Sequence, residues 1–140
     1  MGKYKLFGTT ADVGVRSEGP GIKEAFEAQA AGMFSIMVDM RGVRAVDSFE
    51  ISVGSEGGGY VELLAAWLEE LLYISDVRQV FLREFEITKV EAGRLAATVK
   101  GEEIDPSRHV MKTPVKAVTY HKMKVERTDT GVKTTVVYDI

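Results

Sequence analysis

The sequence contains no cysteine, and this absence removes several classes of chemistry. Without thiols the chain has no disulfide, no thiolate nucleophile and no thiolate metal site, so any metal must be held by oxygen or imidazole ligands. Only two histidines are present, His109 and His121, which leaves little basis for a zinc site. If the chain binds a metal, oxygen ligands are its main resource.

Long apolar runs and a strong net charge are also missing. The apolar stretches fall far short of the ~20 residues that a membrane span requires, and the first residues, MGKYKLF, lack the apolar block of a signal peptide. With 18 basic and 21 acidic residues the net charge is -3, so no overall field attracts the protein to nucleic acid or an anionic membrane. We expect a soluble cytoplasmic protein without membrane contact, in which any RNA contact is local or indirect.

The patterning predicts an α+β fold with two helices packed on a mainly antiparallel sheet. Apolar residues recur every three or four positions from Ile22 to Met37 and from Val61 to Leu72, the spacing of a helix face, with Met33 and Trp67 among the expected core residues. No repeat or proline-rich linker divides the chain, so we expect a single domain over residues 1–140. Strands are predicted over 3–8, 13–17, 43–53, 79–89, 94–104, 115–126 and 132–139.

The predicted strand over 115–126 carries a histidine and a row of lysines. If this strand alternates regularly, His121 shares a face with Met123, so we expect a hydrogen-bonded histidine near the core rather than a metal ligand or general base. Lys116, Lys122 and Lys124 then lie on the opposite face. Such a row is usually solvated, but it is also the best local strip for phosphate or an acidic partner.

Two aspartates far apart in sequence are the main candidates for a metal site. Asp12 stands in the stretch TTADVG at 9–14, and Asp139 points away from the apolar face that Tyr138 and Ile140 share on the last strand. If the chain ends at Ile140, its terminal carboxylate adds oxygen donors of the kind that a hard divalent cation prefers. From spacing alone, an Asx-turn at Asp12 and a merely exposed Asp139 remain the default interpretation.

An ordered set of motifs over nearly the whole chain resembles the archease family. The family opens with a His-Thr-Ala-Asp-Ile-Gly-like motif, to which residues 9–14, TTADVG, correspond. Further similarity lies in EAFEAQAAGMF at 24–34, ELLAAWLEELLY at 62–73, GEEID at 101–105 with His109, VKAVTYH at 115–121 and the final pair Asp139-Ile140. The order of these pieces, rather than any one of them, makes the resemblance specific.

The resemblance implies an accessory protein for the GTP-dependent tRNA-splicing ligase, which joins exon halves after intron removal. Archeases promote guanylylation and multiple turnover of that ligase, without a turnover of their own, and they bind a divalent cation, with calcium seen in the family. Carried over to this sequence, the ligands are the side chains of Asp12 and Asp139 and the backbone oxygens of Ile140.

The chain departs from the family pattern at Thr9, where the family usually has histidine, although the aspartate of the motif is retained. Arg108 and Lys116 are further candidates for contact with phosphate or with the ligase. Two other functions stay open. One is a chaperone-like protein-binding module that uses exposed apolar surface. The other is a metal-dependent hydrolase or transferase with Asp12 and Asp139 as a carboxylate pair, although no general base or nucleophile is recognised near them.

Overall fold

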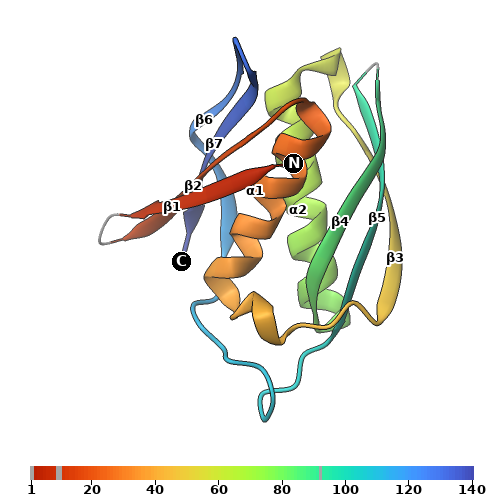
Figure 1. Ribbon diagram of the computed structural model, residues 1–140, viewed down its shortest axis with the longest axis vertical. Helices are drawn as coiled ribbons and strands as arrows, with labels where there is room; N and C mark the ends of the chain where they lie inside the picture. The colour runs from red at the N-terminus through yellow and green to blue at the C-terminus, as the bar shows by residue number, and fades with distance from the viewer. Residues whose placement is uncertain (1, 9–10, 92) are drawn as a thin grey trace.

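Two antiparallel sheets enclose two helices in the computed structural model, which describes residues 2–8, 11–91 and 93–140 (Figure 1). Helices α1 (Ile22–Met37) and α2 (Tyr60–Arg78) lie between the sheets. The four-stranded sheet has the order β1 (Lys3–Gly8), β2 (Asp12–Gly19), β7 (Gly131–Asp139), β6 (Ala117–Thr128), and the three-stranded sheet the order β3 (Asp47–Gly54), β5 (Arg94–Glu103), β4 (Val80–Glu91). Neither helix has the length and apolar character needed to cross a membrane, which holds for every helix of the described residues.

The α+β prediction is confirmed, but the strands form two sheets where one was expected. The reason lies in α1, which is apolar on more than one side. Gly32 of α1 meets Val15 of β2, whereas Phe34 packs its ring 5.7 Å from that of Phe85 on β4. A helix buried on opposite sides needs a layer on each side, which the two sheets supply.

The predicted core residues lie in the core. Met33, Phe34 and Trp67 are fully buried. The Trp67 ring stands edge-on to Phe85 at 6.5 Å, and its Nε1 donates a hydrogen bond of 3.0 Å to the carbonyl oxygen of Phe26. This bond links α2 to α1 and satisfies the polar end of a buried indole.

A buried polar network joins α1 to β2 and β7. The side-chain nitrogen of Gln29 donates to the carbonyl oxygen of Val15 at 3.0 Å and to Thr134 Oγ1 at 2.7 Å, and Gln29 Oε1 accepts from the Tyr138 hydroxyl at 2.7 Å. Ser17 Oγ donates to the Ala25 carbonyl oxygen at 2.8 Å. Burial raises the pKa of the Tyr138 phenol well above its ordinary value, so this hydroxyl stays protonated and remains a donor.

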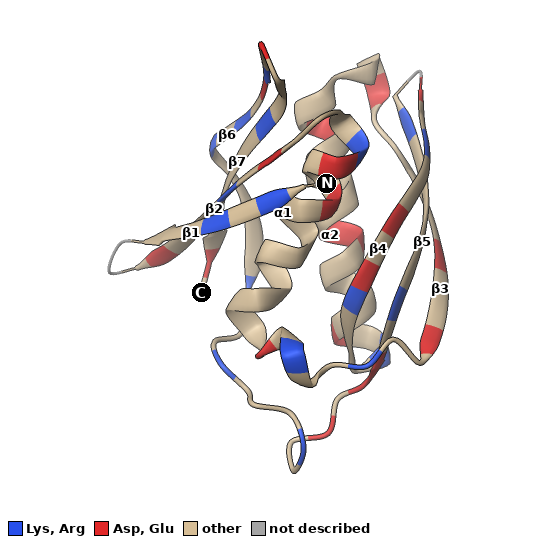
Figure 2. Cartoon of the chain, viewed as in Figure 1, with Lys and Arg blue, Asp and Glu red and all other residues tan. Residues whose placement is uncertain are grey.

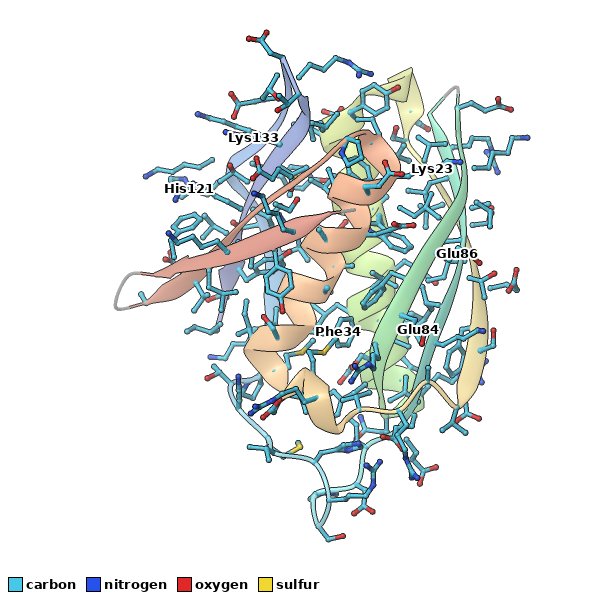
Figure 3. All side chains as sticks on the ribbon, viewed as in Figure 1. Lys23, Phe34, Glu84, Glu86, His121 and Lys133 are labelled. Carbon is cyan, nitrogen blue, oxygen red and sulfur yellow. The ribbon has the colours of Figure 1, made fainter. Side chains whose placement is uncertain are left out.

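The prediction that His121 lies near the core is wrong. Strand β6 loses its regular register to β7 between Thr119 and Lys124, and Lys122 has a φ of +59° within this irregularity. Since a bulge shifts every later side chain, Met123 is buried while His121 is exposed. Figure 3 shows His121 at the outside of the molecule, whereas Phe34 lies among the helices.

We expect Gly101→Ala to destabilise the protein by about 1–3 kcal/mol, the usual cost of overpacking. A Cβ at Gly101 in β5 would lie 1.9 Å from the Phe81 carbonyl oxygen and 2.7 Å from the Leu82 Cα, so β4 and β5 would have to separate. Gly42→Ala is the matched control, because a Cβ there meets nothing within 4 Å. Chemical denaturation measures both variants; equal stability of the two would contradict the packing argument.

Candidate metal centre and its surroundings

The pairing of β2 with β7 brings Asp12 directly opposite Asp139. Opposed residues of an antiparallel pair have Cα atoms about 4.5–5.5 Å apart and point to the same side of the sheet. In Figure 2 acidic positions mark the end of β7, beside the C-terminus, and the adjoining end of β2. Two candidate ligands separated by most of the chain are therefore neighbours.

The inner side of this strand end is anchored in the core. Tyr138, fully buried, sits opposite Val13 and donates to Gln29. Ile140 is half-buried and packs against the hydrophobic core, while Asp139 between them is exposed. The predicted alternation along β7 is confirmed, and it directs the Asp139 carboxylate away from the core.

On its other side, the end of β7 contacts the start of β6. Ala117 is the register partner of Asp139, and the backbone nitrogen of Lys116 donates to the Asp139 carbonyl oxygen at 2.8 Å. The predicted candidate Lys116 therefore lies beside the aspartate pair, held there by its main chain.

The donor chemistry of this corner fits a hard divalent cation with part of its coordination shell open. Like charges directly opposite on two strands repel, and among the described residues no lysine or arginine forms an ion pair with Asp139. The described part of the chain brings together no group of three or more histidine, aspartate or glutamate side chains suited to a metal. Calcium takes six to eight oxygens, so main-chain oxygens and water would complete such a site.

The glycine of the opening motif serves the packing of β1 on β2. A Cβ at Gly14 would lie 2.1 Å from the ring of Phe7, which therefore rests directly on the Gly14 backbone. The guanidinium of Arg16 stacks on the same ring at 4.0 Å from its centroid. Thr9 and Thr10 lie outside the described residues, so the departure at Thr9 remains a feature of the sequence.

Arg108, a second sequence candidate, belongs to a different cluster around the buried Glu102. Its guanidinium forms an ion pair with Glu102 and donates to the Gly42 carbonyl oxygen at 2.9 Å. Glu102 also accepts from the backbone nitrogen of Arg44 at 2.7 Å and pairs with His109 Nε2 at 3.0 Å. Arg108 therefore uses its charge to hold the loop between β5 and β6.

The same cluster assigns the tautomer of His109. Its Nδ1 accepts from the backbone N–H of Asp105 at 3.0 Å, which leaves the proton on Nε2 to be donated to Glu102. Burial of Glu102 opposes its ionisation, but hydrogen bonds from Arg108, His109 and Arg44 outweigh that effect and hold the pKa of the carboxyl well below its usual range. His109 is thus a structural residue.

Comparison with known proteins decides the family. A model of the Archease protein family matches residues 4–140. The chain is 40% identical to the archease of Pyrococcus abyssi over 134 residues, which are 94% of this chain and 93% of that protein. It is 35% identical to the archease of Sulfurisphaera tokodaii, with all of both chains covered. The chain belongs to the archease family.

Two solved structures share the fold. The solution structure of Methanobacterium thermoautotrophicum protein 1598 matches with a TM-score of 0.82 at 34% identity, over 98% of each chain. The crystal structure of a Thermotoga maritima archease matches with a TM-score of 0.62 at 21% identity, over 97% of this chain and 96% of that one, and thus shows the fold alone. Membership confirms the resemblance seen in the motifs, while the metal ligands stay a prediction.

The sequence analysis did not predict two polar clusters of this archease-family chain, one around Gln29 and one around Glu102. Gln29 interrupts the apolar stripe of α1, and a buried amide on such a stripe is a signal for an internal hydrogen-bond network. The pairing of Glu102 with Arg108 and His109 has a weaker signal, because only a fold brings residues from β5 and the following loop together.

We expect Glu102→Gln to lower the free energy of unfolding by about 2 kcal/mol at neutral pH, because hydrogen bonds to a charged group are lost. The lowered folded-state pKa stabilises the fold above the unfolded pKa of about 4.3, and this contribution is lost as the pH falls through the folded-state value. The difference between wild type and variant should be constant at pH 6–8, to within about 0.5 kcal/mol, and shrink below about pH 4. Denaturation across this range measures it, and a difference independent of pH would refute the assignment.

Proposed function

We propose that this protein is an accessory protein that activates the GTP-dependent tRNA-splicing ligase, and that it promotes guanylylation and multiple turnover while holding a divalent cation, calcium first among the candidates. The observation that carries this proposal is the register of β2 and β7, which sets Asp12 across from Asp139 in a chain of the archease family. Like charges directly opposite on two strands repel, and a divalent cation held between the two carboxylates would offset that repulsion.

In the proposed site some residues bind the cation, and others fix the strand end that carries them. Asp12 and Asp139 hold the cation with their carboxylates, and Ile140 contributes its backbone oxygens while its side chain stays packed against the core. A bound divalent cation neutralises the facing carboxylates and supplies positive charge with open positions for an oxygen ligand. Tyr138 and Lys116 keep the strand end in place through their bonds to Gln29 and to the Asp139 carbonyl.

This arrangement favours activation through contact rather than catalysis by the chain itself. Val13 and Tyr138 turn their side chains to the core side of the sheet. Among the described residues, Ala117, the register partner of Asp139 on β6, offers the carboxylates neither a nucleophile nor a general base. We therefore propose that the ligase performs the chemistry, and that this protein binds to it and carries no turnover of its own.

Metal binding can be measured without any activity assay. We expect saturating calcium to raise the melting temperature of the wild type, since a ligand at about 100 times its dissociation constant stabilises the fold by about 2.7 kcal/mol. Asp12→Asn and Asp139→Asn should each abolish this rise, and in chelator the Asp139→Asn variant should be at least as stable as wild type, because a like-charge contact is relieved.

The control for this thermal-shift measurement is Asp129→Ala, which removes an exposed aspartate at the β6–β7 turn. It should keep the full response to calcium. A calcium response that survives in both asparagine variants would rule out the aspartate pair as the site.

The accessory role predicts a gain in turnover. Purified protein added to its ligase with GTP, a manganese salt and RNA halves should raise the number of ligations per ligase, and both asparagine variants should lose this effect while Asp129→Ala keeps it. An unchanged turnover number with wild-type protein would sink the proposal. Hydrolysis of GTP by the protein alone would instead favour the alternative of a metal-dependent hydrolase.

A chaperone-like role is the second candidate function. The T. maritima relative is described as a "possible chaperone", and several large apolar side chains of this chain are exposed, among them Tyr73, Val77, Val110 and Met111. Exposed apolar surface of this kind binds unfolded chains. Suppression of the aggregation of unrelated proteins, measured by light scattering, separates this role from one restricted to the ligase.

A further inference from the structure

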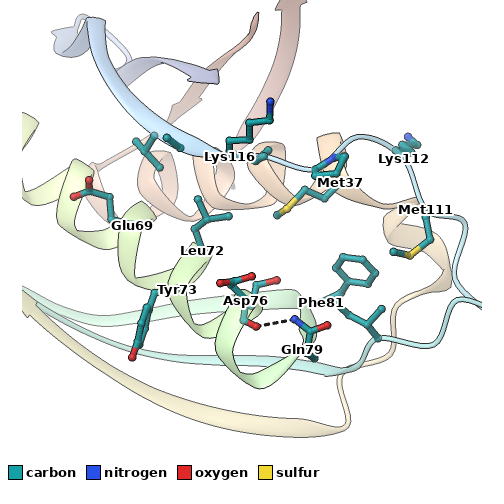
Figure 4. A pocket seen from close by; sticks show the side chains of 16 residues that line it. Met37, Glu69, Leu72, Tyr73, Asp76, Gln79, Phe81, Met111, Lys112 and Lys116 are labelled. Atoms are coloured by element: carbon teal, nitrogen blue, oxygen red, sulfur yellow. Dashed lines mark hydrogen bonds between the residues drawn. The ribbon is translucent and has the colours of Figure 1, made fainter. Parts of the chain in front are cut away.

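An apolar groove of about 660 Å³ runs between the C-terminal half of α2 and the segment that leads into β6 (Figure 4). Its apolar lining comes from separate parts of the chain: Met37 of α1, Leu72 of α2, Phe81 of β4 and Met111, Val115 and Val118 before and in β6. Tyr73, 62% exposed, and Met111, 49% exposed, stand at its border. Removing such apolar surface from water is favourable, so a partner that covered the groove would bind more tightly.

The free edge of strand β6 forms one border of the groove. The strand pairs with β7 and ends the four-stranded sheet, so among the described residues no strand pairs with its other side. Ala117 and Val118, which are adjacent in β6, both line the groove, together with Pro114, Val115 and Lys116 before the strand. Since neighbouring residues of a strand point to opposite faces, this adjacent pair indicates contact along the edge of β6 and not along one face. The groove is therefore the place where a fifth strand of this sheet would lie.

Charges of opposite sign stand on the two walls. Glu69 and Asp76 belong to the exposed side of α2, and Lys112 and Lys116 belong to the chain that enters β6. Asp76 is exposed, and Gln79 donates a hydrogen bond of 2.7 Å to its main-chain oxygen and not to its carboxylate. A partner that carries basic groups toward α2 and acidic groups toward the lysines would be complementary to both walls.

We propose that this groove binds an extended segment of a partner protein, which adds a fifth strand to β6 and places alternate apolar side chains against Leu72 and Phe81. Backbone groups at a free edge provide the affinity of such an addition, and pockets for alternate side chains provide its specificity. This inference rests on the proposed function in one respect: the partner that we name is the tRNA-splicing ligase.

The position of the groove connects it with the candidate metal centre. Ala117 lines the groove and is the register partner of Asp139, and Lys116 donates its backbone N–H to the Asp139 carbonyl oxygen. A strand added to β6 would thus lie two strand spacings, about 10 Å, from Asp139 and three spacings, about 14 Å, from Asp12, since neighbouring strands are 4.7–4.9 Å apart. One docked segment of the ligase would reach both features.

The test uses Tyr73→Asp and Met111→Asp, which place a charge at the groove border without disturbing a buried side chain. Val46→Asp is the matched control, because Val46 is 65% exposed and lies outside the groove. Affinity for the purified ligase is measured by interferometry, together with ligation turnover. We expect each groove variant to bind at least tenfold more weakly and the control to bind as wild type does.

Hydrogen exchange of the protein with and without ligase locates the contact. Added protection over residues 115–120 supports strand addition, whereas protection confined to other segments overturns it. Equal affinity of wild type and groove variants also overturns the inference and leaves the proposed function standing if turnover still rises. Binding that the groove variants weaken, without any gain in turnover, would reject the proposed function and keep the docking site. Absence of binding by the wild type rejects both.

Discussion

The buried amide of Gln29 is the interaction on which the arrangement of α1 and the four-stranded sheet depends. It donates to the Val15 carbonyl on β2 and to Thr134 on β7, and it accepts from Tyr138 on β7. Each of these groups is buried, and an unpaired buried polar group costs about 1–3 kcal/mol. One side chain therefore secures three partners on two strands, and among the described residues every buried side-chain polar atom has a partner.

This network matters for the outer face because strand register and side-chain direction are inseparable. A slip of one residue would turn every side chain of β7 to the other face. Tyr138 would lose Gln29 and enter solvent, and Asp139 would be driven toward the core. The internal hydrogen bonds of Gln29 thus oppose the slip that would separate Asp139 from Asp12, so residues that no ligand touches determine the geometry of the candidate metal centre.

Periodicity predicted the elements well, since a helix stripe and a strand alternation depend on neighbours in sequence. The ends of α1 at Ile22 and Met37 and the span of β1 were visible in the sequence. The second sheet was not visible, because the apolar stripe of α1 indicates only one buried side and the helix is buried on two. The prediction that His121 lies near the core was wrong because the alternation of residue types in the sequence does not reveal a bulge. The pairing of Asp12 with Asp139 depends on a register across 127 residues (139 minus 12). The residues alone offered it only as an alternative to an Asx-turn and an exposed aspartate, and the family resemblance made it the favoured prediction.

The two proposed sites share structural elements, and this has a thermodynamic consequence. Asp139 lies between β2, which carries its facing aspartate, and β6, whose residues Lys116 and Ala117 also line the groove. In the proposed site, a cation that held the end of β7 would reduce its motion and, through the Lys116–Asp139 bond, would also order the start of the β6 edge. Less conformational entropy would then be lost when a partner strand pairs there. Since coupling between sites is reciprocal, a docked partner must strengthen cation binding by the same factor, so the two sites would act as one regulatory unit.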